Sequence, residues 1–190
     1  VKSLVWKLSS DHSTLIQILP PVSGKSVANI LLFEPRVFKD DRGYFYESFN
    51  QTEFTNATGI ESYFIQDNHS YSTKGVLRGL HFQKPPHVQA KLIKVVIGTI
   101  WDVVVDLRKD SPTFRQHMGF ELSAENKKQL YVPQGFAHGF VVLSEVAEVL
   151  YKCDKFYAPQ AESGIIYNDP TLAIDWKITE DKLVVSGKDK

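Results

Sequence analysis

The sequence predicts an all-β protein, a sandwich or a barrel that carries only short helical turns. Short runs of apolar and aromatic residues recur along the chain, and turns rich in Gly, Pro and Asp separate them. No helical period is sustained anywhere, which argues against helical layers. The length of 190 residues suits one domain with a sizeable buried core.

Residues 1–29 form an N-terminal extension of open role, and the predicted domain covers residues 30–190. Within the extension, Pro20-Pro21 and Ser23-Gly24 interrupt the apolar residues, so no long element is expected there. Three alternatives remain for this segment: an edge strand, an arm that reaches a second subunit, or a segment foreign to the protein.

The β pattern begins directly after the extension. An apolar run at 30–33 is followed by a charged turn at 39–43 and by an aromatic strand at 44–49. Residues 50–58 are expected to form a short helix, and residues 63–70 form the next strand.

The stretch 75–97 is the most informative part of the chain. It reads as two strands around a Pro85-Pro86 corner, and polar side chains stand among its apolar ones: Arg78, His81, Gln83, His87, Gln89 and Lys91. Buried polar groups need partners or water, so either these groups line a cavity or the stretch is an edge hairpin with one wet face. In a cavity, a histidine would be an acid or base and a lysine could stabilise an anion.

The second half of the domain continues the β pattern. Residues 100–107 are nearly all apolar, apart from Asp102 and Asp106, which predicts a central strand. Residues 123–126 resemble one helical turn with a serine cap. Further strands are expected at 114–122, at 138–143 and 147–153 as a pair, and at 174–176.

Composition excludes several classes of protein. Lys and Arg number 22, as do Asp and Glu, so bulk charge argues against a nucleic-acid binder. The single cysteine, Cys153, cannot form an intrachain disulfide, which fits a cytoplasmic location. No apolar run reaches membrane-spanning length, and the N-terminus lacks the pattern of a secretory signal. We therefore expect no membrane and no nucleic-acid partner.

The spacing Pro133-x-Gly135-x-x-His138 resembles the second motif of the cupins, which are small double-stranded β-barrels. In metal-binding cupins this histidine joins an HxH pair and a glutamate. Here Phe82 and Gln83 follow His81, so the pair is missing, and a lysine stands near the expected place of the acidic ligand. Metal sites need several converging ligands, so we expect no metal.

A longer series of motifs resembles one family, the dTDP-4-dehydrorhamnose 3,5-epimerases, from about residue 30 to the end. The similar segments are 41–50 (DRGYFYESFN), 66–70 (QDNHS), 76–83 (VLRGLHFQ), 122–127 (LSAENK), 133–140 (PQGFAHGF), 150–152 (LYK), 168–170 (NDP) and 186–189 (SGKD). The resemblance implies a double-stranded β-helix (cupin or jelly-roll) barrel, a homodimer, and no metal or organic cofactor.

The resemblance also implies a substrate and a reaction. The substrate would be dTDP-4-dehydro-6-deoxy-glucose, epimerised at carbons 3 and 5 to dTDP-4-dehydrorhamnose. By motif, His81 would be the base, Asp189 its carboxylate partner, Lys91 the group that stabilises the enolate oxygen, and Tyr151 the opposing acid. By residue type alone, Tyr151 fits an ordinary strand aromatic and Asp189 a frayed tail residue.

The remaining motif positions would bind the nucleotide sugar. The resemblance assigns the pyrophosphate to Arg42, Arg78 and Lys188, and polar edges of the base or sugars to Glu47, Gln66, Asp67 and Asn68. It assigns further substrate contacts to His138, Glu162 and Tyr157.

One difficulty concerns the direction of two of these side chains. Arg78 and His81 have opposite parity, so a regular strand would point them to opposite faces. We predict that Gly79 permits a bulge that re-aims one of them.

Alternative functions are a single-site epimerase or ketoisomerase of another dTDP-deoxysugar, a metal-dependent cupin oxygenase, and a non-catalytic sugar binder.

Overall fold

The computed structural model describes residues 5–8, 14–18, 30–61 and 63–190. Its helical elements are α1 (Gln51–Thr58) and two 3₁₀ turns, Pro159–Ala161 and Glu180–Lys182. Its strands are β1 (Val5–Leu8), β2 (Thr14–Ile18), β3 (Leu31–Pro35), β4 (Phe38–Asp40), β5 (Gly43–Phe45), β6 (Gln66–Thr73), β7 (Val76–Gln83), β8 (Lys91–Ile97), β9 (Thr99–Asp106), β10 (His117–Ser123), β11 (Gln129–Val132), β12 (Phe136–Val142), β13 (Val146–Cys153), β14 (Glu162–Gly164) and β15 (Val184–Val185).

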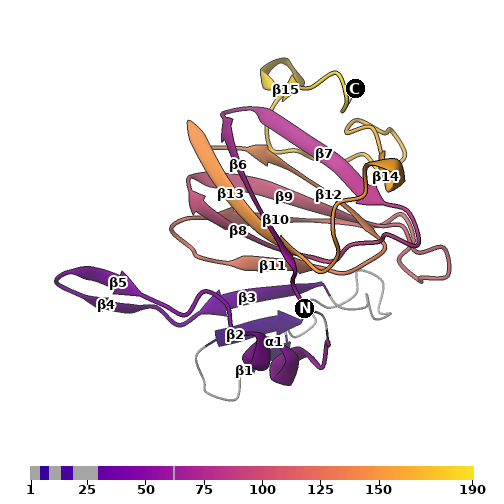
Figure 1. Ribbon diagram of the computed structural model, residues 1–190. Helices are drawn as coiled ribbons and strands as arrows, with labels where there is room; N and C mark the ends of the chain where they lie inside the picture. The colour runs from indigo at the N-terminus through magenta and orange to yellow at the C-terminus, as the bar shows by residue number, and fades with distance from the viewer. Residues whose placement is uncertain (1–4, 9–13, 19–29, 62) are drawn as a thin grey trace.

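The predicted all-β architecture is confirmed over the described residues. A seven-stranded sheet has the order β1-β2-β3-β11-β8-β13-β6, and a six-stranded sheet has the order β10-β9-β12-β7-β14, with β15 beside β7 (Figure 1). The β4–β5 hairpin forms a small sheet of its own and projects to the left of the barrel in this view. The described parts of the extension, β1 and β2, lie at the edge of the larger sheet, as the edge-strand alternative expected; residues 1–4, 9–13 and 19–29 lie outside the description.

Apolar side chains from both sheets form the core between them. Strand alternation turns one face of each strand inward, so Ile93 and Leu130 of the larger sheet meet Val104 and Leu122 of the smaller one. A second cluster covers the outer face of the smaller sheet, where the C-terminal segment contributes Trp176. The predicted central strand is confirmed, because β9 lies between β10 and β12.

Helix α1 covers the outer face of the larger sheet, and its predicted position is confirmed. The side chain of Asn50 caps the helix by accepting hydrogen bonds from the backbone N–H groups of Thr52 and Glu53. The buried ring of Phe54 packs against Phe33 and Tyr131 on that face.

Two predicted strand pairings were wrong. Strands β7 and β8 do not form a hairpin, because the Pro85-Pro86 corner carries the chain from the smaller sheet to the larger one. Strands β12 and β13 also lie in different sheets. Residue patterns show that a segment is a strand but not which sheet it joins. The crossover has a functional consequence, since polar groups of β7 and β8 now face one another across the barrel.

Two smaller predictions also differ from the structure. Residues 174–176 are irregular rather than a strand, and Trp176 donates its indole N–H to the carbonyl of Tyr167. The aromatic strand at 44–49 ends at Phe45. The single turn with a serine cap is confirmed, because after β10 ends at Ser123 the Ser123 hydroxyl accepts from the N–H of Asn126 and its carbonyl accepts from the N–H of Lys127.

The predicted bulge at Gly79 is confirmed. In the β7–β12 pairing, His81 lies opposite His138 and Arg78 lies opposite Phe140, so three steps in β7 match two in β12. Gly79 has φ +127, and a Cβ there would lie 2.5 Å from the Cα of Gly139. The extra residue removes the parity conflict between Arg78 and His81.

We predict that Gly79→Ala destabilises the fold by roughly 2–4 kcal/mol, because overpacking adds to a backbone conformation that L residues rarely adopt. Denaturant unfolding measures the change. Gly59→Ala is the matched control, because Gly59 also has positive φ (+71) but has nothing within 4 Å of the added carbon. Equal stability of the two variants would contradict the close contact at Gly79.

Candidate active site

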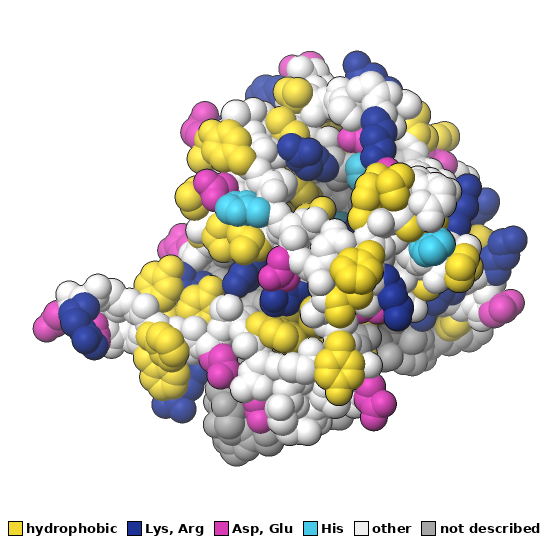
Figure 2. Space-filling model, in the orientation of Figure 1, with side chains coloured by type: hydrophobic (Ala, Val, Ile, Leu, Met, Phe, Trp, Pro, Cys, Tyr) yellow, Lys and Arg dark blue, Asp and Glu magenta, His cyan; other side chains and the backbone are white. Residues whose placement is uncertain are grey.

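A cavity of about 310 Å³ lies between the two sheets, and a second one of about 290 Å³ shares part of its wall. Most predicted site residues line one or both: Gln66, Asn68, Arg78, His81, Lys91, His138, Tyr151, Tyr157, Glu162, Lys188 and Asp189. Figure 2 shows basic side chains and a histidine close together on the upper part of this face, where Figure 1 places β7 and the C-terminus. Of the two predictions for residues 75–97, the cavity is therefore confirmed and the edge hairpin is not.

His81 is held by a buried carboxylate from the C-terminal tail. Its Nε2 lies 2.5 Å from Oδ1 of Asp189, and the side chain of Asp189 is 6% exposed. The other carboxylate oxygen accepts a hydrogen bond from the Ser186 hydroxyl. The tail is ordered here because β15 pairs in parallel with β7. A carboxylate can only accept, so this ring nitrogen donates, and in a neutral imidazole the other nitrogen is then the one that can accept a proton.

Lys91 and Tyr151 project from the opposite wall. They belong to the neighbouring strands β8 and β13, and the Lys91 Nζ lies 5.8 Å from the centre of the Tyr151 ring. Burial lowers the pKa of Lys91, while charges on Cys153, Asp102 and Glu162 oppose this effect. Burial also raises the pKa of Tyr151, which keeps its phenol protonated.

A second histidine is paired with a carboxylate that sequence reasoning did not assign to the site. His138 Nε2 lies 2.8 Å from Oδ2 of Asp102, whose side chain is fully buried. Burial raises the pKa of Asp102, and His138 and Lys91 oppose the shift. The other oxygen, Oδ1, has no hydrogen-bond partner among the described residues. The sequence did contain a sign of this buried carboxylate, because Asp102 interrupts the apolar run at 100–107.

Glu162 connects the mouth of the cavity to the tail. It accepts hydrogen bonds from Lys188 Nζ at 2.5 Å and from the Tyr157 hydroxyl at 2.6 Å. The backbone N–H of Tyr157 donates to Gln66, whose amide in turn donates to Asn68. These bonds bring five predicted substrate-binding positions beside one another at the rim.

Arg78 approaches the same cavity from the bulged strand. Its guanidinium donates to the hydroxyl of Ser72 at 2.9 Å and to the carbonyl of Tyr71 at 3.3 Å. Together with Lys188 it supplies positive charge at the opening, which suits an anionic group there.

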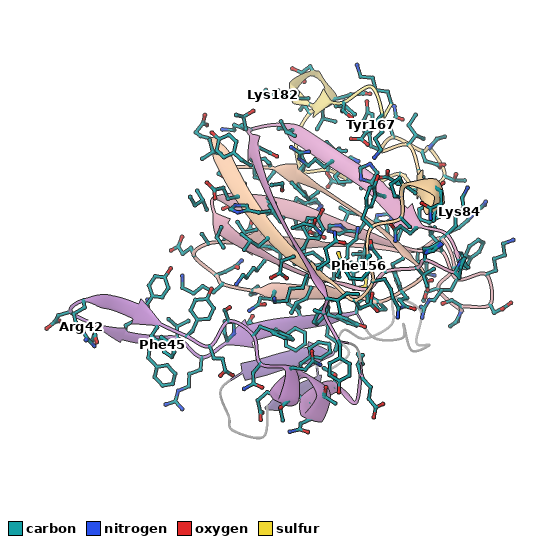
Figure 3. All side chains as sticks on the ribbon, in the orientation of Figure 1. Arg42, Phe45, Lys84, Phe156, Tyr167 and Lys182 are labelled. Carbon is teal, nitrogen blue, oxygen red and sulfur yellow. The ribbon has the colours of Figure 1, made fainter. Side chains whose placement is uncertain are left out.

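Three predicted binding residues do not reach the cavity of the same chain. Arg42 lies at the tip of the β4–β5 hairpin, as Figure 3 shows. Its side chain is 90% exposed and pairs with Asp40. Glu47 lies beside a small pocket near α1. The Asp67 carboxylate bonds to Lys152 at 3.0 Å, because its parity is opposite to that of Gln66 and Asn68.

No group of three or more His, Cys, Asp or Glu side chains among the described residues is arranged to hold a metal ion. No helix within those residues is long and apolar enough to cross a membrane.

Comparison with known proteins identifies the family. Residues 25–190 match the family model of dTDP-4-dehydrorhamnose 3,5-epimerase. The chain belongs to this family. A dTDP-4-dehydrorhamnose 3,5-epimerase of Pseudomonas aeruginosa is 54% identical, over 87% of this chain and 90% of that protein. The chain is therefore an enzyme of the isomerase class.

Solved structures of family members share the fold. The epimerase of Bacillus anthracis, crystallised with TDP and PPi bound, is 47% identical with a TM-score of 0.83, covering 92% of this chain and 96% of that one. The epimerase of Legionella pneumophila, in complex with dTDP-4-keto-L-rhamnose, is 48% identical with a TM-score of 0.82, and 87% of each chain is covered. The predicted cupin-type barrel is thus confirmed.

We predict that Asp102→Asn lowers the pKa of Lys91 further. The substitution removes one of the charges that oppose the effect of burial, so the neutral amine becomes more favourable. An NMR titration of the Lys91 side chain measures the shift. Asp67→Asn is the control, because the Asp67 carboxylate is paired with Lys152 instead. An unchanged or higher pKa of Lys91 in Asp102→Asn would contradict the coupling.

Proposed function

We propose that this protein epimerises carbons 3 and 5 of dTDP-4-dehydro-6-deoxy-glucose, giving dTDP-4-dehydrorhamnose. The main supporting observation is the arrangement of acid and base around one cavity: His81 of the smaller sheet, bonded to Asp189 of the C-terminal tail, faces Tyr151 and Lys91 of the larger sheet. Epimerisation needs proton removal on one face of a carbon and proton delivery on the other. Membership of the family and the ligands named for its solved members support the same substrate class.

The first step is proton removal by His81. Protons on carbons 3 and 5 are acidic because both carbons flank the ketone at carbon 4. The unprotonated ring nitrogen of His81 takes the proton, and the electrons of the C–H bond pass into an enolate. Asp189 orients the imidazole and stabilises the cation that forms. The Lys91 ammonium stabilises the negative charge that develops on the enolate oxygen.

The second step is proton delivery by Tyr151. Its phenol gives a proton to the carbon from the opposite wall, the carbonyl re-forms, and the configuration at that carbon inverts. The phenolate regains a proton from solvent and His81 releases one, so the net proton balance is zero. The same groups then act on the other carbon after the sugar ring is repositioned.

We assign substrate binding to the groups at the rim. Arg78 and Lys188 suit the pyrophosphate, since guanidinium and ammonium groups donate to phosphate oxygens, and His138 suits a further substrate contact. The polar and aromatic side chains beside them suit the base and sugars: Gln66, Asn68, Tyr157 and Glu162. Asp67 keeps its predicted role only if its bond to Lys152 is exchanged for one to substrate.

A homodimer accounts for Arg42 and Glu47, which lie outside the cavity of their own chain. The β4–β5 hairpin that carries Arg42 exposes the aromatic side chains of Phe38, Tyr44 and Phe45. Exposed apolar surface of this kind favours contact with another protein surface. We propose that the hairpin packs on a second copy of the chain and brings Arg42 to its cavity. We also propose a cytoplasmic location, supported by the free and buried thiol of Cys153.

Incubation of the protein with the 4-keto sugar nucleotide in heavy water tests the function. Deuterium at carbons 3 and 5, together with inversion at both, is the expected result. Exchange and inversion at one carbon would indicate a single-site epimerase. Absence of exchange at either carbon would contradict the proposal.

We predict that His81→Asn lowers the rate of deuterium exchange at both carbons by roughly 100- to 10,000-fold, the usual contribution of a general base. Binding of dTDP, measured by calorimetry, should persist. His69→Asn is the control, because His69 pairs with Glu148 outside both cavities. Near-normal exchange in His81→Asn would assign the base to another residue.

We predict that Tyr151→Phe separates exchange from inversion. Proton removal by His81 continues in part, but delivery from the opposite wall fails, so recovered substrate carries deuterium without full inversion. NMR of the sugar protons measures both quantities. Tyr167→Phe serves as the control, because Tyr167 bonds to Glu180 in the C-terminal segment. An unchanged ratio of products would show that Tyr151 only packs.

We predict that Asp189→Asn slows epimerisation by roughly tenfold or more, since the amide keeps the size of the side chain but can favour the wrong imidazole tautomer. Steady-state kinetics measure the loss. Asp181→Asn, an exposed carboxylate earlier in the same segment, is the control. A wild-type rate in Asp189→Asn would mean that another group orients His81.

A further inference from the structure

Gln83 ends strand β7, two residues after His81, and its carboxamide is buried with 7% of the residue exposed. The amide nitrogen donates to the carbonyl of His87 at 2.6 Å and, more weakly, to that of Phe156 at 3.5 Å. The amide oxygen accepts from the backbone N–H of Ala158 at 2.7 Å. One side chain therefore binds backbone groups of two separate loops.

The residues bonded to Gln83 on the second loop, Phe156 and Ala158, flank Tyr157. This loop connects β13 to the Pro159–Ala161 turn and is irregular, so its backbone has no strand ladder to fix it (Figure 3 labels Phe156 on it). Side-chain amides supply that support instead: Gln83 binds Phe156 and Ala158, while Gln66 and Gln89 bind the backbone of Tyr157 and Lys155. Because Gln83 and His81 lie on the same strand, the hydrogen bonds of Gln83 fix the position of the loop relative to the proposed base, His81.

Tyr157 itself stands at the mouth of the site. It is half exposed, its side chain lines both cavities, and its hydroxyl donates to Glu162. Gln83 also lines one of the two cavities, but only 7% of the residue is exposed and its amide groups are already bonded to the backbone. We therefore expect Gln83 to affect substrate through the loop that it holds.

We propose that Gln83 is a positioning residue for substrate binding. It holds Tyr157 at the mouth of the cavity, at a fixed position relative to His81. The inference rests on the proposed function and extends it, because the motif at 76–83 contains Gln83 but assigns it no role in the reaction. In this proposal the hydrogen bonds of Gln83 position a substrate-binding residue, rather than contributing only to the stability of the barrel.

The test is a double-mutant cycle between Gln83→Met and Tyr157→Ala, assayed as steady-state epimerisation. Methionine has a similar length but cannot bond to the backbone, so Gln83→Met should raise KM by roughly tenfold, the loss expected for buried hydrogen bonds, with kcat changed much less. In the Tyr157→Ala background the same change should leave KM unaltered, because the ring that Gln83 positions is absent.

A matched control is Asn126→Leu. The Asn126 amide also bonds to several backbone groups, those of Ser123, Lys128 and Glu121, but in a turn that lines neither cavity. This variant should lose thermal stability without a change in KM. If Gln83→Met does not fold, Gln83→Glu replaces it, since the carboxylate keeps the acceptor for Ala158 and loses the donors; the same rise in KM is expected.

Two results would overturn the inference: an unchanged KM in Gln83→Met, or a rise in KM that persists in full without the Tyr157 ring. A fall in kcat at constant KM would also overturn it, because Gln83 would then act on His81.

If the wild-type protein binds dTDP without epimerising the sugar, the proposed function fails. The Kd of dTDP, measured by calorimetry across the same four proteins, then tests the inference in place of KM.

Discussion

The need to pair buried charge shapes the interior of this protein. A barrel filled only with Ile, Leu and Val would need no such pairing, but here Lys91, Asp102, His138 and Asp189 all lie within it. Each desolvated polar group requires a partner. Asp189 meets His81 and Ser186, and Asp102 meets His138. The C-terminal tail is therefore a structural part of the site, since without it the imidazole of His81 would lose its carboxylate.

The two-sheet architecture separates the groups of the proposed reaction. The smaller sheet carries His81 and His138, while the larger one carries Lys91 and Tyr151, so in the proposed mechanism the base and the acid lie on opposite sides of the cavity. Burial lowers the pKa of Lys91 and raises that of Tyr151. The same apolar walls that stabilise the fold thus adjust the groups assigned to the reaction.

Local sequence rules worked where the interaction concerned is local. The short helix expected at 50–58 and the bulge expected at Gly79 are both present, because helix ends and backbone geometry depend on a few neighbouring residues. Local rules wrongly predicted that β7 pairs with β8 and that residues 174–176 form a strand. Whether a strand joins one sheet or the other, or an apolar segment pairs at all, depends on contacts with residues far away in the chain.

The sequence by itself determined the all-β class, the position of most strands and, through its motifs, a set of site residues that proved to share a cavity. Alternation of apolar and polar residues reports which face of a strand is buried, and motifs report residue identity. Only the tertiary structure decided that Asp102 pairs with His138, that Gln83 holds the loop of Tyr157, and that Arg42 lies outside the cavity of its own chain. Those facts depend on the direction in which each element crosses the barrel, and no local pattern of residues encodes that direction.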